Sequence, residues 1–202
     1  MRIAILGAGR VGRTLGARWN TTGHDIAYGV RDPSDIRYAE LAGTARPTDA
    51  VLGAEVILVA LPWGAVEAVL SGIDVADAVV IDATNPLAAN SRELQVHPEL
   101  SGAHFVAQWA RSSHVVKAFN TTGAGNMADP TYAAGAPMML LAGDDAVAKS
   151  VVSTLASEIG LDAVDAGTLS AARDLEHLAM IWIRLAYPLG HGPDIAFALL
   201  HR

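Results

Sequence analysis

The stretch Ile3-Ala4-Ile5-Leu6-Gly7-Ala8-Gly9-Arg10-Val11-Gly12 joins a short apolar run to a glycine-rich turn of the form G-x-G-x-x-G. A helical pattern continues over Arg10–Thr22, and a second apolar run follows at Ile26–Val30. This order of strand, turn, helix and strand predicts a βαβ unit that binds a dinucleotide. In such a unit the first glycine makes the turn, the second admits a pyrophosphate, and the third lets the helix pack on the strand. The alternative is a tight packing turn that holds no ligand.

The rest of the chain alternates short apolar runs with helical patterns. The later runs are Val56–Leu61, Val79–Ala83, Val115–Phe119, Met138–Ala142 and the weaker Leu161–Val164. The helical patterns between them cover Ala65–Leu70, Ser101–Arg111 and Asp144–Ile159, of which the last has Asp144 as its expected cap. Because most runs are apolar at consecutive positions, they predict strands buried on both faces of a sheet. We therefore expect an α/β protein with a Rossmann-type, doubly wound and mainly parallel sheet.

The pattern changes after Gly167. Apolar spacing over Thr168–Tyr187 predicts one long amphipathic helix, and Ile195–Leu200 predicts a short terminal strand or tail. We expect a dinucleotide-binding Rossmann domain over residues 1–142 and a small C-terminal α/β cap over residues 143–202, integrated with it.

Composition excludes several classes of protein. The 202 residues contain no cysteine, which removes disulfides, thiolate metal sites and cysteine nucleophiles. The net charge of −7 argues against a nucleic-acid partner. No apolar run approaches the ~20 residues that a membrane span requires, and the N-terminus does not have the pattern of a signal peptide. We expect a soluble, cytoplasmic protein.

The choice between NAD and NADP depends on residues about 20 positions after the last glycine of the turn. Arg31 stands there, and its guanidinium suits a ribose 2′-phosphate. Asp32 follows at once and would instead bind the 2′-hydroxyl of NAD. A third interpretation makes Arg31 a solvated loop residue.

Polar and aromatic residues follow three of the predicted strands. Ligands of open α/β sheets bind at the carboxyl ends of strands, so we expect Pro62-Trp63, Thr84-Asn85-Pro86 and Asn120-Thr121-Thr122 to converge at that edge. Asn85 and Asn120 offer a donor and an acceptor each and suit a carboxamide or the edge of a pterin-like ring. Loop capping is the alternative for both. Trp63 suits the face of a flat ring, or else packs in the core.

Lys117 is one of two lysines and lies within an apolar run. We expect a mid-strand residue that points into a helix layer, with a buried stem and a paired head, rather than a catalytic acid. The seven histidines, at positions 24, 97, 104, 114, 177, 191 and 201, show no H-E-x-x-H spacing, so we expect no metal site. No residue is predicted to be catalytic.

Four further segments give the chain a family resemblance. They are Pro62-Trp63, Asn85-Pro86-Leu87, Val116-Lys117-Ala118-Phe119-Asn120-Thr121 and Asp165-Ala166-Gly167-Thr168-Leu169-Ser170. With the glycine-rich turn, they resemble the NADP oxidoreductase, coenzyme F420-dependent family, from Met1 through the long final helix. The resemblance implies a small Rossmann protein that passes a hydride between NADP(H) and an 8-hydroxy-5-deazaflavin. The fold also resembles the reductase module of the STEAP ferric reductases, which uses NADPH and a flavin.

The resemblance assigns roles to individual positions. Its cofactor loop corresponds to Gly7, Gly9, Arg10, Val11 and Gly12, its 2′-phosphate reader to Arg31, its nicotinamide segment to Ala60, Leu61, Pro62 and Trp63, and its acceptor loop to Asn120, Thr121, Thr122 and Gly123. Two positions depart from the family pattern. Val30 stands where the family often has serine, and Asn120 stands where it often has histidine. The second departure leaves the acceptor open.

These interpretations support three hypotheses. The first is an NADPH-linked oxidoreductase whose acceptor is a deazaflavin, with coenzyme F420 as co-substrate. The second is an NADPH:flavin reductase that uses FMN or FAD, and the third is an NADP-binding module without turnover. Hydride transfer requires close stacking of two rings and exclusion of water rather than an acid–base pair. We also expect a homodimer in which the helix over Thr168–Tyr187, which carries Leu178, Trp182 and Leu185, contributes to the interface and helps close the acceptor pocket.

Overall fold

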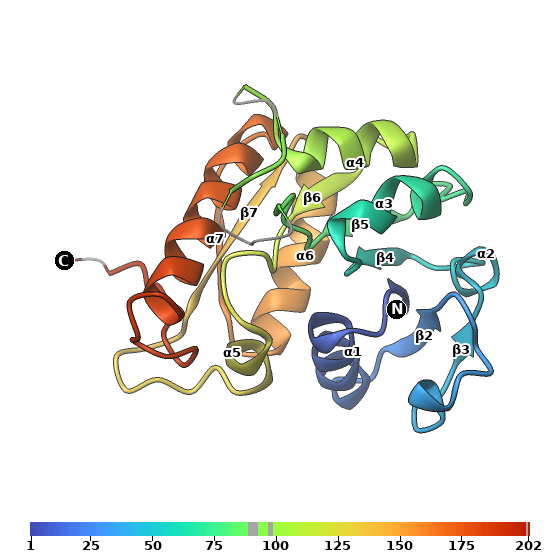
Figure 1. Cartoon of the computed structure of the whole chain (residues 1–202), viewed down its shortest axis with the longest axis horizontal. Helices are drawn as coiled ribbons and strands as arrows, with labels where there is room; N and C mark the ends of the chain where they lie inside the picture. Colours follow the sequence, from blue (N-terminus) through green and yellow to red (C-terminus); the bar gives the residue numbers. More distant parts are fainter. Residues whose placement is uncertain (89–92, 97–98, 201) are drawn as a thin grey trace.

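The computed structural model describes residues 1–88, 93–96, 99–200 and 202 as one eight-stranded sheet between two layers of helices (Figure 1). The strands are β1 (Arg2–Leu6), β2 (Asp25–Gly29), β3 (Thr44–Ala45), β4 (Val56–Val59), β5 (Val79–Asp82), β6 (Val115–Lys117), β7 (Met138–Gly143) and β8 (Asp162–Asp165). The helices are α1 (Arg10–Thr21), α2 (Pro47–Ala50), α3 (Trp63–Leu70), α4 (Gly102–Ala110), α5 (Ala124–Ala128), α6 (Ala146–Glu158) and α7 (Ala172–Ala186), with 3-10 turns η1 (Ile36–Tyr38) and η2 (Leu169–Ala171).

The strand order is β3-β2-β1-β4-β5-β6-β7-β8. The first six strands in this order run parallel, β7 is antiparallel to β6, and β8 runs parallel to β7. The chain returns to the centre of the sheet between β1 and β4, which is the topological switch point of a doubly wound fold. The predicted Rossmann-type fold, with a mainly parallel sheet, is confirmed.

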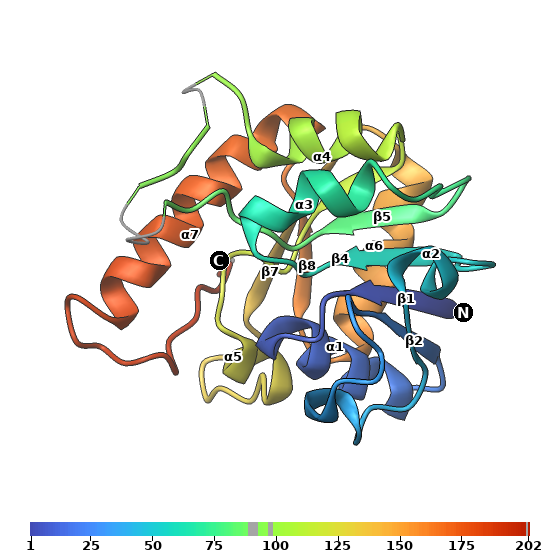
Figure 2. The same cartoon turned by 45° about the vertical axis from the view of Figure 1, so that its right-hand side comes forward.

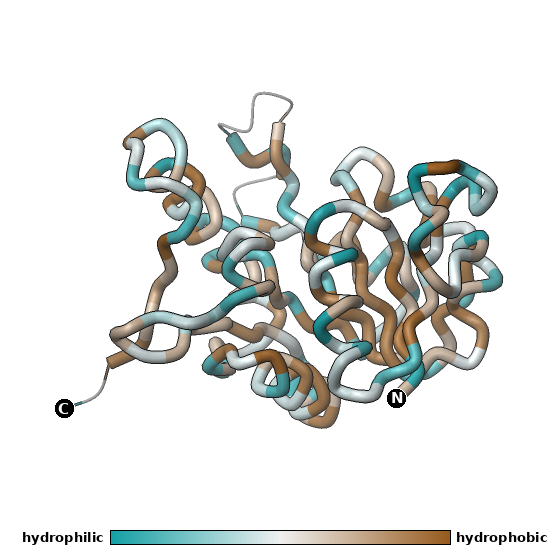
Figure 3. The backbone as a smooth tube through the Cα atoms, turned by 90° about the horizontal axis from the view of Figure 1, so that it is seen from below, coloured by the Kyte–Doolittle hydropathy of each residue, from teal (hydrophilic) through white to brown (hydrophobic). Residues whose placement is uncertain are grey.

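Alternate residues of the central strands supply two separate cores. Ile3 and Ile5 of β1 pack with α1 and α6, whereas Ala4 and Leu6 pack with α3 and α4 on the other face. Figure 2 shows α1 below these strands and α3 and α4 above them. The apolar strands lie side by side inside the molecule in Figure 3. Burial on both faces explains why the sequence shows continuous apolar runs instead of alternation.

Several predicted boundaries need correction. Asp145, not Asp144, caps α6, because its carboxylate accepts from the backbone N–H groups of Val147 and Ala148. Asp144 accepts instead from the backbone N–H of Leu169 at 3.0 Å, which ties the start of η2 to the end of β7. The long helix predicted after Gly167 is interrupted by η2, so α7 begins at Ala172.

The C-terminal segment Ile195–Leu200 forms a tail without strand geometry, although its Phe197 carbonyl accepts from Met138 at the start of β7. The predicted division at residue 142 falls at the end of β7, across which the sheet continues, and it stays a prediction. Among the described residues, no helix is long and apolar enough to cross a membrane.

Candidate functional site

The glycine-rich turn leaves β1 at its carboxyl end, between β2 and β4 (Figure 1). Gly7 has a left-handed φ of +104°, and a Cβ there would lie 2.5 Å from the Ala60 carbonyl oxygen. A Cβ on Gly12 would lie 2.1 Å from the Gly7 carbonyl oxygen. The packing of the protein itself therefore requires glycine at both positions, as the turn and the helix–strand contact predict.

Gly9 is a different case. A Cβ at this position would meet no heavy atom within 4 Å, and its φ of −78° is open to any L-residue. The packing therefore does not require glycine here. Gly9 is the N-cap of α1, and no side chain forms a capping hydrogen bond there. Open space over an uncapped helix N-terminus is what backbone recognition of an anion requires.

The segment Ala60–Pro62 lies against the same turn. The backbone N–H of Ala60 donates to the Leu6 carbonyl at 2.9 Å, and the Leu61 side chain lies 3.1 Å from where a Gly7 Cβ would stand. Pro62 is the N-cap of α3. The predicted cofactor turn and the predicted nicotinamide segment are thus neighbours at one edge of the sheet.

The side chains of Arg31 and Asp32 differ in whether the protein itself already supplies them with hydrogen-bond partners. Arg31 is exposed after β2, and within the described part of the chain no side chain pairs with its guanidinium. The Asp32 carboxylate accepts from both the backbone N–H and the hydroxyl of Ser34, at 3.1 and 2.7 Å. These hydrogen bonds hold the pKa of Asp32 below its usual value. Asp32 is therefore engaged in its own turn, whereas Arg31 is free to bind an anion.

Asn85 and Asn120 form a reciprocal pair across the ends of β5 and β6. The Asn85 Nδ2 donates to the Asn120 carbonyl at 2.9 Å, and the Asn120 Nδ2 donates to Asn85 Oδ1 at 3.0 Å. Asn120 is buried, yet its Oδ1 has no hydrogen-bond partner. An unpaired buried acceptor is costly unless a ligand satisfies it. The predicted convergence of these two loops is confirmed.

The turn before Asn120 is strained. Phe119 has a φ of +57°, which a bulky residue rarely adopts. Its ring packs edge-on against Trp19 of α1 at 5.6 Å, and its N–H donates to the Met139 sulfur. Tertiary packing therefore holds an unfavourable backbone conformation at the loop that carries Asn120, as is common at functional sites.

A hollow of about 230 Å³ lies between the glycine-rich turn and the loop after β6. The predicted residues that line it are Arg10, Val11, Thr122 and Gly123. Asn120 and Thr121, the other two members of the predicted acceptor loop, are buried and do not line it. The structure thus brings the predicted cofactor turn and the predicted acceptor loop to one cavity.

The same hollow is also lined by Tyr187, at the end of the helix expected to close the acceptor pocket, and by Pro193 and Asp194, which the sequence did not indicate. They reach it because Asn126 of α5 donates to the carbonyls of Pro193 and Ile195, at 3.1 and 2.8 Å. The C-terminal segment is therefore held across the acceptor loop. No sequence periodicity reports such a contact, since it joins residues almost 70 positions apart.

Trp63 packs rather than standing over the cavity. Its ring lies 5.3 Å from that of Trp109 in α4 and within about 3.2 Å of the position that a Gly102 Cβ would occupy. Of the two interpretations that the sequence leaves open for Trp63, packing in the core agrees with these contacts. A role in binding the face of a flat ring stays a prediction.

Lys117 is buried and paired, as expected, but it ends β6 instead of lying mid-strand. No three histidine, aspartate or glutamate side chains gather in a metal-binding arrangement within the described ranges. His97 and His201 lie outside those ranges.

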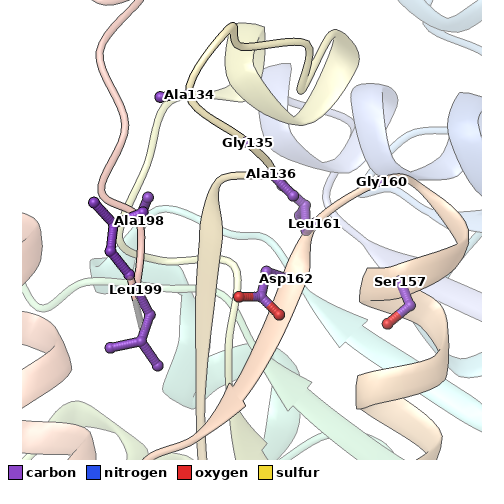
Figure 4. A pocket seen from close by; sticks show the side chains of 10 residues that line it. Ala134, Gly135, Ala136, Ser157, Gly160, Leu161, Asp162, Ala198 and Leu199 are labelled. Carbon is purple, nitrogen blue, oxygen red and sulfur yellow. The ribbon is translucent and has the colours of Figure 1, made fainter. Parts of the chain in front are cut away.

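A second hollow, of about 400 Å³, lies beside β8 and the C-terminal tail (Figure 4). Small and apolar residues make up most of its lining, and Ser157 and Asp162 supply the polar side chains. None of the predicted site residues lines it. It therefore lies apart from the candidate site.

The candidate site suits a phosphorylated dinucleotide on three independent observations. Gly9 leaves open space at an uncapped helix N-terminus, Arg31 presents a guanidinium beyond β2, and Asn120 Oδ1 is a buried acceptor without a partner. A pyrophosphate, a 2′-phosphate and a carboxamide are the groups that these features complement.

Comparison with known proteins agrees with this interpretation. Residues 2–86 match the family model described as NADP oxidoreductase, coenzyme F420-dependent. The chain is 31% identical over 183 residues to the metalloreductase STEAP3 of Rattus norvegicus, and the match covers 89% of this chain and 36% of the rat protein. The chain therefore spans about a third of that relative.

Two solved structures cover the whole chain. A protein proposed to be an F420-dependent NADP reductase, from Arthrobacter sp. FB24, superposes with a TM-score of 0.88 at 30% identity over all of both chains. A hypothetical protein of Sinorhizobium meliloti superposes with a TM-score of 0.75 at 26% identity, over all of this chain and 96% of the other.

Proposed function

The chain belongs to the NADP oxidoreductase, coenzyme F420-dependent family, and we propose that this NADP-dependent oxidoreductase transfers a hydride between NADP(H) and a deazaflavin of the coenzyme F420 class. One observation carries the proposal most directly. Arg10 and Val11 of the cofactor turn line the same hollow as Thr122 and Gly123 of the acceptor loop. Two ligands bound at these loops would therefore meet.

When bound, NADPH supplies the hydride, and the acceptor takes it up together with a solvent proton. The protein itself binds, orients and excludes water. The turn Gly7–Gly12 holds the pyrophosphate on backbone N–H groups, and Ala60–Pro62 lines the nicotinamide. Asn85 and Asn120 orient a carboxamide or the edge of the acceptor ring. Tyr187 and Pro193 line the hollow on its C-terminal side. No side chain is assigned a proton-transfer role.

Arg31 is proposed as the reader of the 2′-phosphate. A charge-assisted pair with this group is worth about 1.5–3 kcal/mol, or roughly ten- to a hundredfold in affinity. We therefore expect the chain to bind NADPH at least about tenfold more tightly than NADH, and Arg31→Ala to remove this difference by weakening NADPH alone. Titration of the wild type and of Arg31→Ala with NADPH and with NADH measures the four affinities.

Asp32→Ala is the matched control for Arg31→Ala, because its carboxylate accepts from Ser34. This variant should keep the preference for NADPH. Equal affinity of the wild type for NADH and NADPH would refute the role of Arg31 and transfer the choice to Asp32.

The acceptor is tested by mixing the protein with NADPH and coenzyme F420, FMN or FAD without oxygen. Loss of the deazaflavin absorbance supports the proposal. Reduction of FMN or FAD alone would make the protein an NADPH:flavin reductase, a candidate favoured by the similarity to the metalloreductase STEAP3. Tight NADPH binding without reduction of any acceptor would leave an NADP-binding module.

A homodimer in the cytoplasm is part of the same proposal. Trp182, expected at the interface, faces inward and donates to the Ile195 carbonyl at 2.8 Å. The exposed apolar side chains of this region are instead Ile181, Tyr187 and Leu189, which are 50%, 57% and 66% exposed. Sedimentation at micromolar concentration should find a dimer, and Ile181→Glu should weaken it. A wild-type monomer would refute this part.

A further inference from the structure

Three ionisable side chains are fully buried together behind the candidate site. The Lys117 Nζ lies 2.9 Å from Asp82 Oδ2 and 2.9 Å from Glu176 Oε1, and all three side chains are 0% exposed. They come from the ends of β5 and β6 and from the second turn of α7. Burial acts to lower the pKa of Lys117, but the two carboxylates outweigh it and hold this pKa above the usual lysine value. Lys117 is therefore a buried ammonium.

Lys117 and Asp82 both form hydrogen bonds with a single residue, Thr84. The Lys117 Nζ donates to the Thr84 carbonyl at 2.6 Å. The Asp82 Oδ1 accepts from the Thr84 backbone N–H at 2.9 Å and from its hydroxyl at 2.7 Å. Every polar group of Thr84 is thus held by the cluster, at the point where the chain leaves β5.

The next residue along the chain is Asn85, whose amide pairs with Asn120. Lys117 is thus linked to both asparagines. It precedes Asn120 by three positions in the chain, and its ammonium group donates to Thr84, the residue before Asn85. One ammonium group therefore connects the ends of the two strands that carry these loops.

We propose that Lys117 is a positioning residue, which sets the Asn85–Asn120 pair by holding the Thr84 carbonyl. The inference rests on the proposed function in that this pair orients the nicotinamide carboxamide or the acceptor ring. Glu176 extends the control to the C-terminal helix, because its second oxygen accepts from the Gly102 N–H at the start of α4, at 3.1 Å. Through this carboxylate α7 becomes part of the support of the site.

The experiment distinguishes the effect of Lys117 on the Asn85–Asn120 pair from its neutralisation of the two buried carboxylates. Lys117→Met removes the ammonium but leaves two buried carboxylates, so this variant is expected to lose stability. The triple variant Asp82→Asn, Lys117→Met, Glu176→Gln removes the net charge and keeps acceptors for Thr84 and Gly102. It should recover most of the thermal stability. The donor to the Thr84 carbonyl stays absent, because methionine has none.

The first readout requires no coenzyme or acceptor. Side-chain amide protons of Asn85 and Asn120, assigned by NMR from their loss in Asn85→Asp and Asn120→Asp, should exchange with solvent at least about tenfold faster in the triple variant. Lys149→Met is the control, since the only other lysine pairs with Asp165 outside the site. It should leave the exchange unchanged.

The second readout is kinetic. In the triple variant kcat with the acceptor should fall at least about tenfold, while the Kd of NADPH stays within about twofold because the phosphate turn is untouched. Wild-type amide exchange in a stable triple variant would overturn the inference and leave Lys117 a structural residue. Faster exchange in a protein that reduces no acceptor would uphold the positioning of the pair and refute only the proposed function.

Discussion

Gly9 offers a substitution that separates ligand binding from folding. The Gly9→Ala and Gly9→Val side chains would extend into space with no protein atom within 4 Å of the Cβ, on a backbone with φ of −78°. Neither change strains the chain. Glycine is a better N-cap than alanine, so we expect Gly9→Ala to lower the free energy of unfolding by no more than about 1 kcal/mol.

The effect on binding should be larger. A pyrophosphate on the N-terminus of α1 must approach the backbone of Gly9, and a methyl group there displaces it from at least one N–H donor. One charge-assisted hydrogen bond is worth about 1.5–3 kcal/mol, so the Kd of NADPH should rise about ten- to a hundredfold in Gly9→Ala. The bulkier Gly9→Val should abolish measurable binding.

Gly12→Ala is the matched control, since its Cβ would lie 2.1 Å from a backbone oxygen of Gly7. Its free energy of unfolding should fall by about 1–3 kcal/mol or more. Urea unfolding and NADPH fluorescence titration of all variants give both quantities. An affinity of Gly9→Val within twofold of the wild type would refute the assignment of the phosphate site. So would a loss of stability in Gly9→Ala as large as that in Gly12→Ala.

Three further predictions concern the support of the fold. Hydrogen bonds from His114 and from two backbone N–H groups of α6 lower the pKa of Asp145. The contribution of this carboxylate to stability is therefore present above about pH 4 and is lost as pH falls through the lowered pKa of the folded state. The urea midpoints of wild type and Asp145→Asn should differ at pH 7, and this difference should vanish in acid. Asn126→Ala leaves the Pro193 carbonyl without its donor and the Ile195 carbonyl with Trp182 alone, so it should lower the free energy of unfolding by about 1–3 kcal/mol and speed proteolysis of the C-terminal segment. Unchanged proteolysis would contradict the attachment of this segment through Asn126. Trp19→Phe leaves the buried Leu155 carbonyl unpaired and should cost about 1–3 kcal/mol by the same assay, with no change in NADPH affinity.

Much of the fold can be predicted because its signals are local. A strand buried on both faces shows as a run of apolar residues, and such runs predict seven of the eight strands in the described part of the chain. The exception, β3, consists of Thr44 and Ala45, which pair with the end of β2 and are too few to show any period. The predicted cap of α6 is wrong by one position because Asp144 and Asp145 are adjacent and equally suited by type.

The candidate site is predictable only where topology decides it. Parallel strands must deliver their following loops to one edge, which brings Asn85 to Asn120 and the glycine-rich turn to Ala60. Pro193 and Asp194 reach the hollow by another route, through the hydrogen bonds from Asn126 to the Pro193 and Ile195 carbonyls. Tertiary contacts of this kind leave no period or motif in the sequence.

The buried cluster of Asp82, Lys117 and Glu176 is partly predictable from the sequence, unlike the contacts of the C-terminal segment. Alternation along β6 places Lys117 on the same face as Val115, toward α4 and α7. Glu176 lies between the buried Leu175 and Ala179 on the inward face of α7, where an unpaired carboxylate would be prohibitively costly. A lysine in an apolar strand and a glutamate on an apolar helix face each require a partner of opposite charge. Two such opposite anomalies in one chain are strong grounds to expect that they pair, and a pair between these two residues can form only if α7 lies over the ends of β5 and β6.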